Sequence, residues 1–234
     1  MSTVNPGTGS EDRAPGASLL VDQIRVGLFR VFTYLVSDPR TGEGLVVDPG
    51  AEAGRILRMV HKRKVSVRWI VCTHSHPDHT GAAAGVRKAT GGLLVVHEGE
   101  VRALTKWGNR LLSRMIGGQG APSPDRIVRG GERLALGKAE MEILHTPGHS
   151  AGGICLYTEG HLFSGDTLFV GSVGRTDLPG SSVEALARSL REKILVLPDS
   201  TIVWPGHDYG DQTHTTIGWE KEENPFVRAL LAGS

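Results

Sequence analysis

The chain has 234 residues, enough for one large domain or two small ones. Hydrophobic residues make up 39% and charged residues 22%, and the formal net charge of +1 excludes a bulk field that would attract nucleic acid or a membrane surface. No stretch approaches the roughly 20 apolar residues that a membrane helix needs, so we expect neither partner. Residues 1–18 are rich in Gly, Ser, Pro and Thr, which predicts a disordered tail before a single domain over residues 19–234.

The first half of the chain reads as strands alternating with helices. Apolar alternation and short apolar runs predict two strands over residues 19–36, which turn near Gly27, and further strands at 44–48, 67–72 and 93–96. Helical spacing of apolar residues predicts helices at 51–62, 79–89, 98–104 and 107–116.

The second half returns to short strands and ends in helices. We expect strands at 133–136, 141–145, 153–157, 161–164 and 201–204. A helix is predicted at 183–194, and a last helix over 215–231 is interrupted at Asn224-Pro225. Two halves, each a sheet with helices outside it, account for this order.

The role of residues 105–125 is open from the sequence. Trp107, Leu111, Leu112 and Met115 share one helical face over residues 107–116, and a Gly- and Pro-rich stretch follows. Ordinary core packing is the simplest explanation of that face. A lid over an active site, or an oligomer contact, is the sharper alternative.

The two cysteines, Cys72 and Cys155, each lie in an apolar run. Two buried thiols in strands explain them better than a disulfide does. This cysteine usage fits a reducing, cytoplasmic location.

The strongest chemical signal is the stretch His74-Ser75-His76-Pro77-Asp78-His79, which follows a predicted strand. Neutral imidazole is the commonest metal ligand in proteins, and a neighbouring carboxylate suits zinc, iron or manganese. Residues two apart in extended chain point the same way, so His74 and His76 can face one ion. The turn into the next helix can direct Asp78 and His79 toward another ion.

Further candidate ligands stand at later strand ends, each next to a glycine. They are His149, Asp166 and His207. Chemistry is often placed at strand ends, because a rigid sheet holds loop residues in register. Asp48 also ends a strand, and we expect it to support a histidine ligand from behind rather than to bind metal.

This pattern resembles the metallo-β-lactamase-fold superfamily, whose H-x-H-x-D-H motif matches residues 74–79. The resemblance spans Ile24 to Val227 and implies an α+β fold, a four-layer αββα sandwich. It also implies that one ion is held by His74, His76 and His149, a second by Asp78, His79 and His207, with Asp166 bridging them. Two divalent ions would share a hydroxide that serves as the nucleophile, oriented by the catalytic Asp78. Zinc is the expected metal, with iron or manganese as alternatives.

Two branches of the superfamily fit the remaining motifs. Residues 165–169 and 174–177, with the tail over 216–226, resemble glyoxalase II in its compact bacterial form, which hydrolyses glutathione thioesters such as S-lactoylglutathione. Arg175, Tyr209 and Lys221 are candidate contacts for such a thioester or glutathione conjugate, although Asp177 replaces a tyrosine of the longer form. Residues 205–210 and 174–177 also resemble persulfide dioxygenases, in which a single iron is held by the equivalents of His74, His149 and Asp166. A redox or binding module that merely keeps the fold is a third alternative, disfavoured by a complete ligand set.

Overall fold

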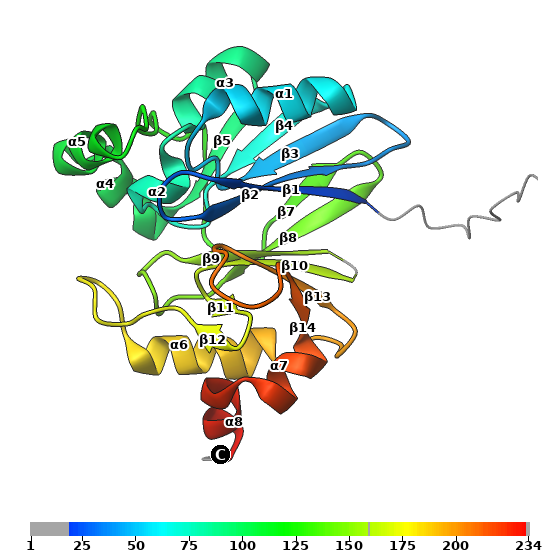
Figure 1. The fold of residues 1–234 in the computed structure, drawn as a ribbon, viewed down its shortest axis with the longest axis vertical. Coiled ribbons are helices and arrows are strands. Elements are labelled where there is room, and N and C mark those ends of the chain that lie inside the picture. The colour runs from blue at the N-terminus through cyan, green and yellow to red at the C-terminus, as the bar shows by residue number, and fades with distance from the viewer. Residues whose placement is uncertain (1–18, 159, 233–234) are drawn as a thin grey trace, which may run out of the picture.

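The computed structural model describes residues 19–158 and 160–232 (Figure 1). The tail predicted over residues 1–18 lies outside the described residues. Two six-stranded sheets lie face to face with helices on their outer sides, so the predicted four-layer αββα sandwich is confirmed.

The first sheet has the strand order β1-β2-β3-β4-β5-β6. Its strands are β1 (Leu20–Val26), β2 (Val31–Ser37), β3 (Glu43–Val47), β4 (Ser66–Val71), β5 (Leu93–His97) and β6 (Arg126–Val128). The pairs β1–β2 and β2–β3 are antiparallel, whereas β3 to β6 run parallel to one another. Parallel neighbours need crossover connections, and helices make them here. These crossovers contain α1 (Ala53–Arg63), α2 (Pro77–Thr80), α3 (Ala83–Thr90), α4 (Glu98–Thr105) and α5 (Trp107–Met115).

The second sheet has the strand order β14-β13-β10-β9-β8-β7. Its strands are β7 (Arg133–Leu136), β8 (Ala139–His145), β9 (Ile154–Thr158), β10 (His161–Gly165), β13 (Ile202–Pro205) and β14 (Thr215–Thr216). Strands β10 and β13 are parallel, and β11 (Leu168–Phe169) forms a small hairpin with β12 (Ser172–Val173) between them in sequence. The outer helices are α6 (Val183–Ser189), which continues as the π-helix η1 (Leu190–Ile194), and the C-terminal pair α7 (Ile217–Glu223) and α8 (Pro225–Ala232).

Alternate residues of the central strands enter different cores. Val47 and Val71 pack between the two sheets, whereas Val46 and Ile70 pack under α1 and α3. This follows from the two-residue period of a strand, which sends neighbouring side chains to opposite faces. A third core packs the second sheet against α6, η1 and α8. The strands are thereby held rigidly, and the loops at their ends are fixed in relative position.

One predicted helix is wrong as a single element. The helix expected over residues 79–89 is divided into α2 and α3. The backbone N–H of Ala82 donates to the carbonyl of Pro49 at 2.8 Å instead of continuing the helix. A Cβ at Gly81 would collide with the carbonyl oxygen of Gly50, so this tight crossing depends on glycine.

Four strands were not anticipated, because they are too short for periodicity to show. They are β6, β11, β12 and β14. The predicted break at Asn224-Pro225 is confirmed, since α7 ends at Glu223 and α8 begins at Pro225. Cys72 and Cys155 are free and buried, as expected. Within residues 19–158 and 160–232, no helix is long and apolar enough to cross a membrane.

Candidate metal centre

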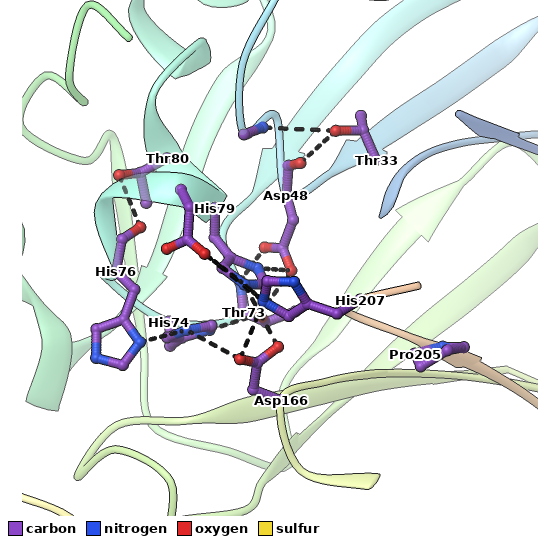
Figure 2. A network of polar contacts seen from close by, with 12 residues as sticks. Thr33, Asp48, Thr73, His74, His76, His79, Thr80, Asp166, Pro205 and His207 are labelled. Carbon is purple, nitrogen blue, oxygen red and sulfur yellow. Dashed lines mark hydrogen bonds and ion pairs between the residues drawn. The ribbon is translucent and has the colours of Figure 1, made fainter. Parts of the chain in front are cut away.

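The predicted ligands converge where four strands end. Figure 2 shows His74, His76, His79, Asp166 and His207 gathered around one space. Residues 74–79 follow β4, and His149 follows β8. Asp166 directly follows β10, and His207 lies two residues after the parallel strand β13. The loops from both sheets therefore meet around a shared space.

The first group of ligand atoms comes from His74, His76 and His149. Nδ1 of His76 lies 2.9 Å from Nε2 of His74 and 3.0 Å from Nε2 of His149. In a tetrahedral site with Zn–N bonds of about 2.0–2.1 Å, ligand nitrogens are about 3.3 Å apart. The three ring nitrogens are thus close to the spacing that one ion requires.

The second group comes from Asp78, His79 and His207. Nε2 of His79 lies 3.1 Å from Nε2 of His207. Oδ2 of Asp78 lies 3.9 Å from the His79 nitrogen and 3.6 Å from the His207 nitrogen. The Asp78 side chain is about one-fifth exposed, at 21%, whereas both histidines are buried, so Asp78 forms the open side of this group.

Asp166 stands between the two groups. Its Oδ2 lies 3.5 Å from Nε2 of His149, and its Oδ1 lies 3.3 Å from Nε2 of His79. Oδ1 is buried without a hydrogen-bond partner in the described chain. A buried carboxylate oxygen without a donor is costly, and a cation shared by the two groups would satisfy it.

In His79, His149 and His207, the ring nitrogen that points away from the site is already engaged. Nδ1 of His149 donates to the carbonyl of Arg175 at 2.9 Å, and Nδ1 of His207 donates to the carbonyl of Phe29 at 2.7 Å. In the neutral ring, this leaves Nε2 as a bare lone pair directed into the site. Nε2 of His79 is bare for the same reason, because its Nδ1 lies 2.9 Å from Oδ2 of Asp48.

These lone pairs face one another, which is unfavourable unless a cation lies between them. In their neutral forms, His79 and His207 present two bare Nε2 atoms only 3.1 Å apart. When no ion is bound, a proton can take its place on His79: burial opposes protonation, but the carboxylates of Asp166, Asp48 and Asp78 outweigh it and raise the pKa of His79 to about 10. Burial lowers the pKa of His74 well below its usual value, which keeps that ring a neutral ligand. The donor set therefore fits divalent ions bound by nitrogen and oxygen.

Asp48 connects the ligand loop to the end of β3. Its Oδ1 accepts the backbone N–H of Thr73 at 2.7 Å, and its Oδ2 accepts the Thr73 hydroxyl at 2.7 Å. The Thr73 oxygen also lies 3.1 Å from Nδ1 of His74. Thr73 thus supports the site from behind and was missed in the sequence, although a hydroxyl directly before His74 was an available signal.

The structure separates the three candidate substrate contacts. The Tyr209 ring stacks on the His207 ring, with centroids 4.5 Å apart and an interplanar angle of 7°. The Arg175 guanidinium is exposed and forms an ion pair with Asp177 at 2.7 Å. Lys221 is paired with Asp199 at 2.6 Å, and Asp199 precedes β13 whereas His207 follows it. Helix α7 therefore anchors Lys221 at the opposite end of that strand from His207, and the structure does not bring Lys221 together with the ligands.

Helix α5 packs beside the site with its polar face inward. Nδ2 of Asn109 donates to the carbonyl of Ser75 at 2.9 Å, and Ser113 is buried with its hydroxyl accepting from Gly120. Trp107 and Met115 are 77% and 75% exposed. Core packing, the simplest explanation of this apolar face, is therefore wrong. The lid and the oligomer contact stay predictions.

The chain is similar to known proteins over most of its length. The model of the metallo-beta-lactamase superfamily matches residues 26–207, and the chain belongs to that superfamily. A hydroxyacylglutathione hydrolase of Polaromonas sp. (strain JS666 / ATCC BAA-500) is 36% identical over 218 residues, covering 91% of this chain and 76% of the relative. The hydroxyacylglutathione hydrolase GloC of Haemophilus influenzae is 34% identical over 200 residues, covering 79% of this chain and 87% of the relative. The chain is thus similar to enzymes of the glyoxalase II-like branch.

Solved structures of similar proteins support the fold. The BLEG-1 B3 metallo-beta-lactamase matches with a TM-score of 0.80 and 33% identity, covering 89% of this chain and 99% of that one. TTHA1623 in a di-iron-bound form matches with a TM-score of 0.78 and 35% identity, covering 88% of this chain and 100% of that one. ETHE1 from Myxococcus xanthus matches with a TM-score of 0.76 and 30% identity, covering 90% of this chain and 85% of that one. The superfamily and the grouped histidines and aspartates together establish a divalent metal site.

Proposed function

We propose that this protein is a metal-dependent hydrolase that cleaves a thioester such as S-lactoylglutathione. The observation that carries the proposal is the presence of two complete ligand groups that share Asp166. The relatives named hydroxyacylglutathione hydrolase, at 34–36% identity, support the same activity. We further propose two divalent ions, with zinc as the first expectation and iron or manganese as alternatives.

The chain's own residues account for how such a reaction would be arranged. Ions bound there would make a water molecule nucleophilic at neutral pH and polarise the thioester carbonyl. Asp78 is the ligand with an open side, so its carboxylate can orient the attacking water. Tyr209 covers the outer face of His207 and can restrict substrate to the opposite side of that ring.

The substrate is proposed to be a small anionic thioester or glutathione conjugate. Arg175 lies at the rim, where its carbonyl accepts from His149 and its guanidinium pairs with Asp177. A guanidinium can bind a carboxylate in two parallel hydrogen bonds, and a substrate carboxylate would compete with Asp177 for them.

A persulfide dioxygenase is the alternative, supported by the likeness to ETHE1 from Myxococcus xanthus. That chemistry needs one iron, for which His74, His149 and Asp166 would suffice. The second group would then be without a role, although Asp48 holds His79 of that group by a 2.9 Å contact. This favours the hydrolase.

Metal analysis with two parallel assays tests the proposal. The purified protein is analysed for metal content, then assayed for S-lactoylglutathione hydrolysis and for O₂ uptake with glutathione persulfide. Two ions per chain with hydrolysis is the expected result. One iron per chain with O₂ uptake would establish the alternative instead.

The Asp78→Ala variant tests the role of the open carboxylate. We expect hydrolysis to fall by more than about 100-fold with little change in unfolding temperature, because Asp78 is partly exposed and lies at the site. Asp22→Asn, which alters an aspartate paired with Arg63 on the surface, is the control. Retained hydrolysis in Asp78→Ala would reject the scheme.

A further inference from the structure

A buried glutamate, Glu100, joins the two loops that carry the first ligand group. We propose that Glu100 is a positioning residue that sets the metal affinity of His74, His76 and His149. The inference rests on the proposed function only in taking these three histidines as ligands of one ion. Glu100 lies in the first turn of α4 and is 3% exposed.

One oxygen of Glu100 holds the loop after β4. Oε2 accepts the backbone N–H of Ser75 at 3.0 Å and also accepts the Ser75 hydroxyl. Ser75 is the residue between His74 and His76. Because the two ligands flank the held residue, a shift of Ser75 would move both rings.

The other oxygen of Glu100 holds the loop after β8. Oε1 accepts the backbone N–H of Gly152 at 2.8 Å. Gly152 lies three residues after His149 in the same turn. One carboxylate therefore spans two loops that are more than seventy residues apart in sequence and that meet at Nδ1 of His76.

The packing around this carboxylate leaves little room for adjustment. A Cβ at Gly152 would lie 2.8 Å from both Cγ and the backbone nitrogen of Glu100, closer than real Cβ contacts. At the start of α4, Nδ1 of His97 accepts the backbone N–H of Gly99 at 3.1 Å, and its Nε2 donates to the carbonyl of Arg129 at 3.0 Å. The helix that carries Glu100 is thus fixed independently of the metal site.

A second contact braces the same loop. The His145 ring stacks on the His97 ring, with centroids 4.0 Å apart, and its Nε2 lies 3.1 Å from the carbonyl of Ala151. Ala151 and Gly152 are therefore both tied to the N-terminal end of α4. The N-terminal end of α4 therefore sets the distance between the loop that carries His149 and the loop that carries His74.

The chemistry of the three donors makes glutamate specific here. Two backbone N–H groups and a hydroxyl point at the two carboxylate oxygens. Glutamine has one acceptor oxygen, so its NH₂ group would face a backbone N–H in either orientation. Glu100→Gln should keep the shape of the side chain while releasing one of the two loops.

Cobalt titration of the metal-free protein tests the proposal without any substrate. Co²⁺ affinity is measured from the visible absorption of the bound ion. The titration is done in two variants: His207→Ala, which weakens the second ligand group, and His149→Ala, which weakens the first. We expect Glu100→Gln to reduce Co²⁺ affinity roughly 10–100-fold in the His207→Ala background and to leave it nearly unchanged in the His149→Ala background. Glu98→Gln, on the same helix but paired with Arg129 at the surface, should change neither.

Each outcome has a defined meaning. An equal loss in both backgrounds, or none in either, would overturn the proposal, because a merely structural residue would not distinguish the two groups. If Glu100→Gln does not fold, Ser75→Ala removes only the hydroxyl donor and should weaken the same group by a smaller factor. Failure of the thioesterase assay would leave these affinities meaningful, so the two proposals fail separately.

Discussion

Oδ2 of Asp48 lies 2.9 Å from Nδ1 of His79, and both side chains are buried. The carboxylate sets which nitrogen of His79 faces the metal site, and its other contacts hold Thr73 before the ligand loop. A residue that binds no metal itself thus determines the orientation of one ligand and the start of the loop that carries the others.

Asp48→Asn tests this relationship. We expect the metal affinity of the second group to fall roughly 10–100-fold. Both carboxylate oxygens of Asp48 accept hydrogen bonds from Thr73 and His79, whereas an asparagine amide has only one acceptor oxygen. The measurement is Co²⁺ titration in the His149→Ala background. Asp22→Asn is the control, since its partner Arg63 lies on the surface. Affinity equal to that of the parent would show that His79 needs no support.

Gly206→Ala tests the space around the bridging carboxylate. A Cβ at this position would overlap Oδ1 of Asp166 and lie 2.9 Å from the carbonyl carbon of Gly165. We expect loss of bound metal and a lower free energy of unfolding, by about 1–3 kcal/mol, from overpacking. Metal content and chemical denaturation check this.

Gly108→Ala is the matched control for that substitution. A Cβ there meets no atom within 4 Å, and the residue lies within α5. Alanine should be neutral or slightly stabilising in a helix. If both variants bind metal equally, the close approach at Gly206 does not matter for the site.

The sequence was sufficient for the parts of the site that follow from chain order. His74 to His79 lie in one loop, and the apolar runs before His149, Asp166 and His207 marked strand ends. A rigid pair of sheets converts such strand ends into neighbours, so their convergence was predictable once the fold was recognised. The placement of Asp48 behind a ligand histidine followed from the same reasoning, whereas the identity of that histidine, His79, came from the structure.

Other parts depend on tertiary contacts with no local signal. Glu100 lies in an ordinary charged helix start, and nothing nearby shows that its carboxylate spans two distant loops. The acceptors for His149 and His207 are backbone carbonyls, which any residue supplies. The position of Lys221 depended on where α7 packs, and periodicity carries no information about that.

The exposed face of α5 can be tested by removing its apolar groups alone. Trp107→Ser with Met115→Ser should leave the fold intact, because both side chains are exposed while Asn109 and Ser113 hold the helix in place. If the face is a lid, KM should rise several-fold; if it is an oligomer contact, the mass from light scattering should fall. Val196→Ser, at another exposed apolar residue, is the control. Unchanged KM and mass would remove both roles.

Asp38 holds the two sheets together at the end of β3 that is remote from the ligands. Its carboxylate accepts from the side chain of Arg40 at 2.9 Å and from the backbone N–H of Lys138 at 2.8 Å, next to the turn between β7 and β8. The hydrogen bonds from Arg40 are the main cause that holds the pKa of Asp38 well below its usual 3.8, against the effect of burial.

A carboxylate whose pKa is lower in the folded protein than in the unfolded chain stabilises the fold at pH values above its unfolded-state pKa. That stabilisation is lost as the pH falls toward its folded-state pKa. Asp38→Asn should therefore lower the unfolding temperature by about 2–4 °C at pH 7. The difference from the parent should shrink as the pH falls below about 4, where Asp38 begins to bind a proton in the unfolded chain. Calorimetry of the metal-free parent and the metal-free variant from pH 7 to pH 3 checks this. Before metal removal, the two proteins should contain the same amount of metal at pH 7. A difference that grows toward low pH would contradict the sign.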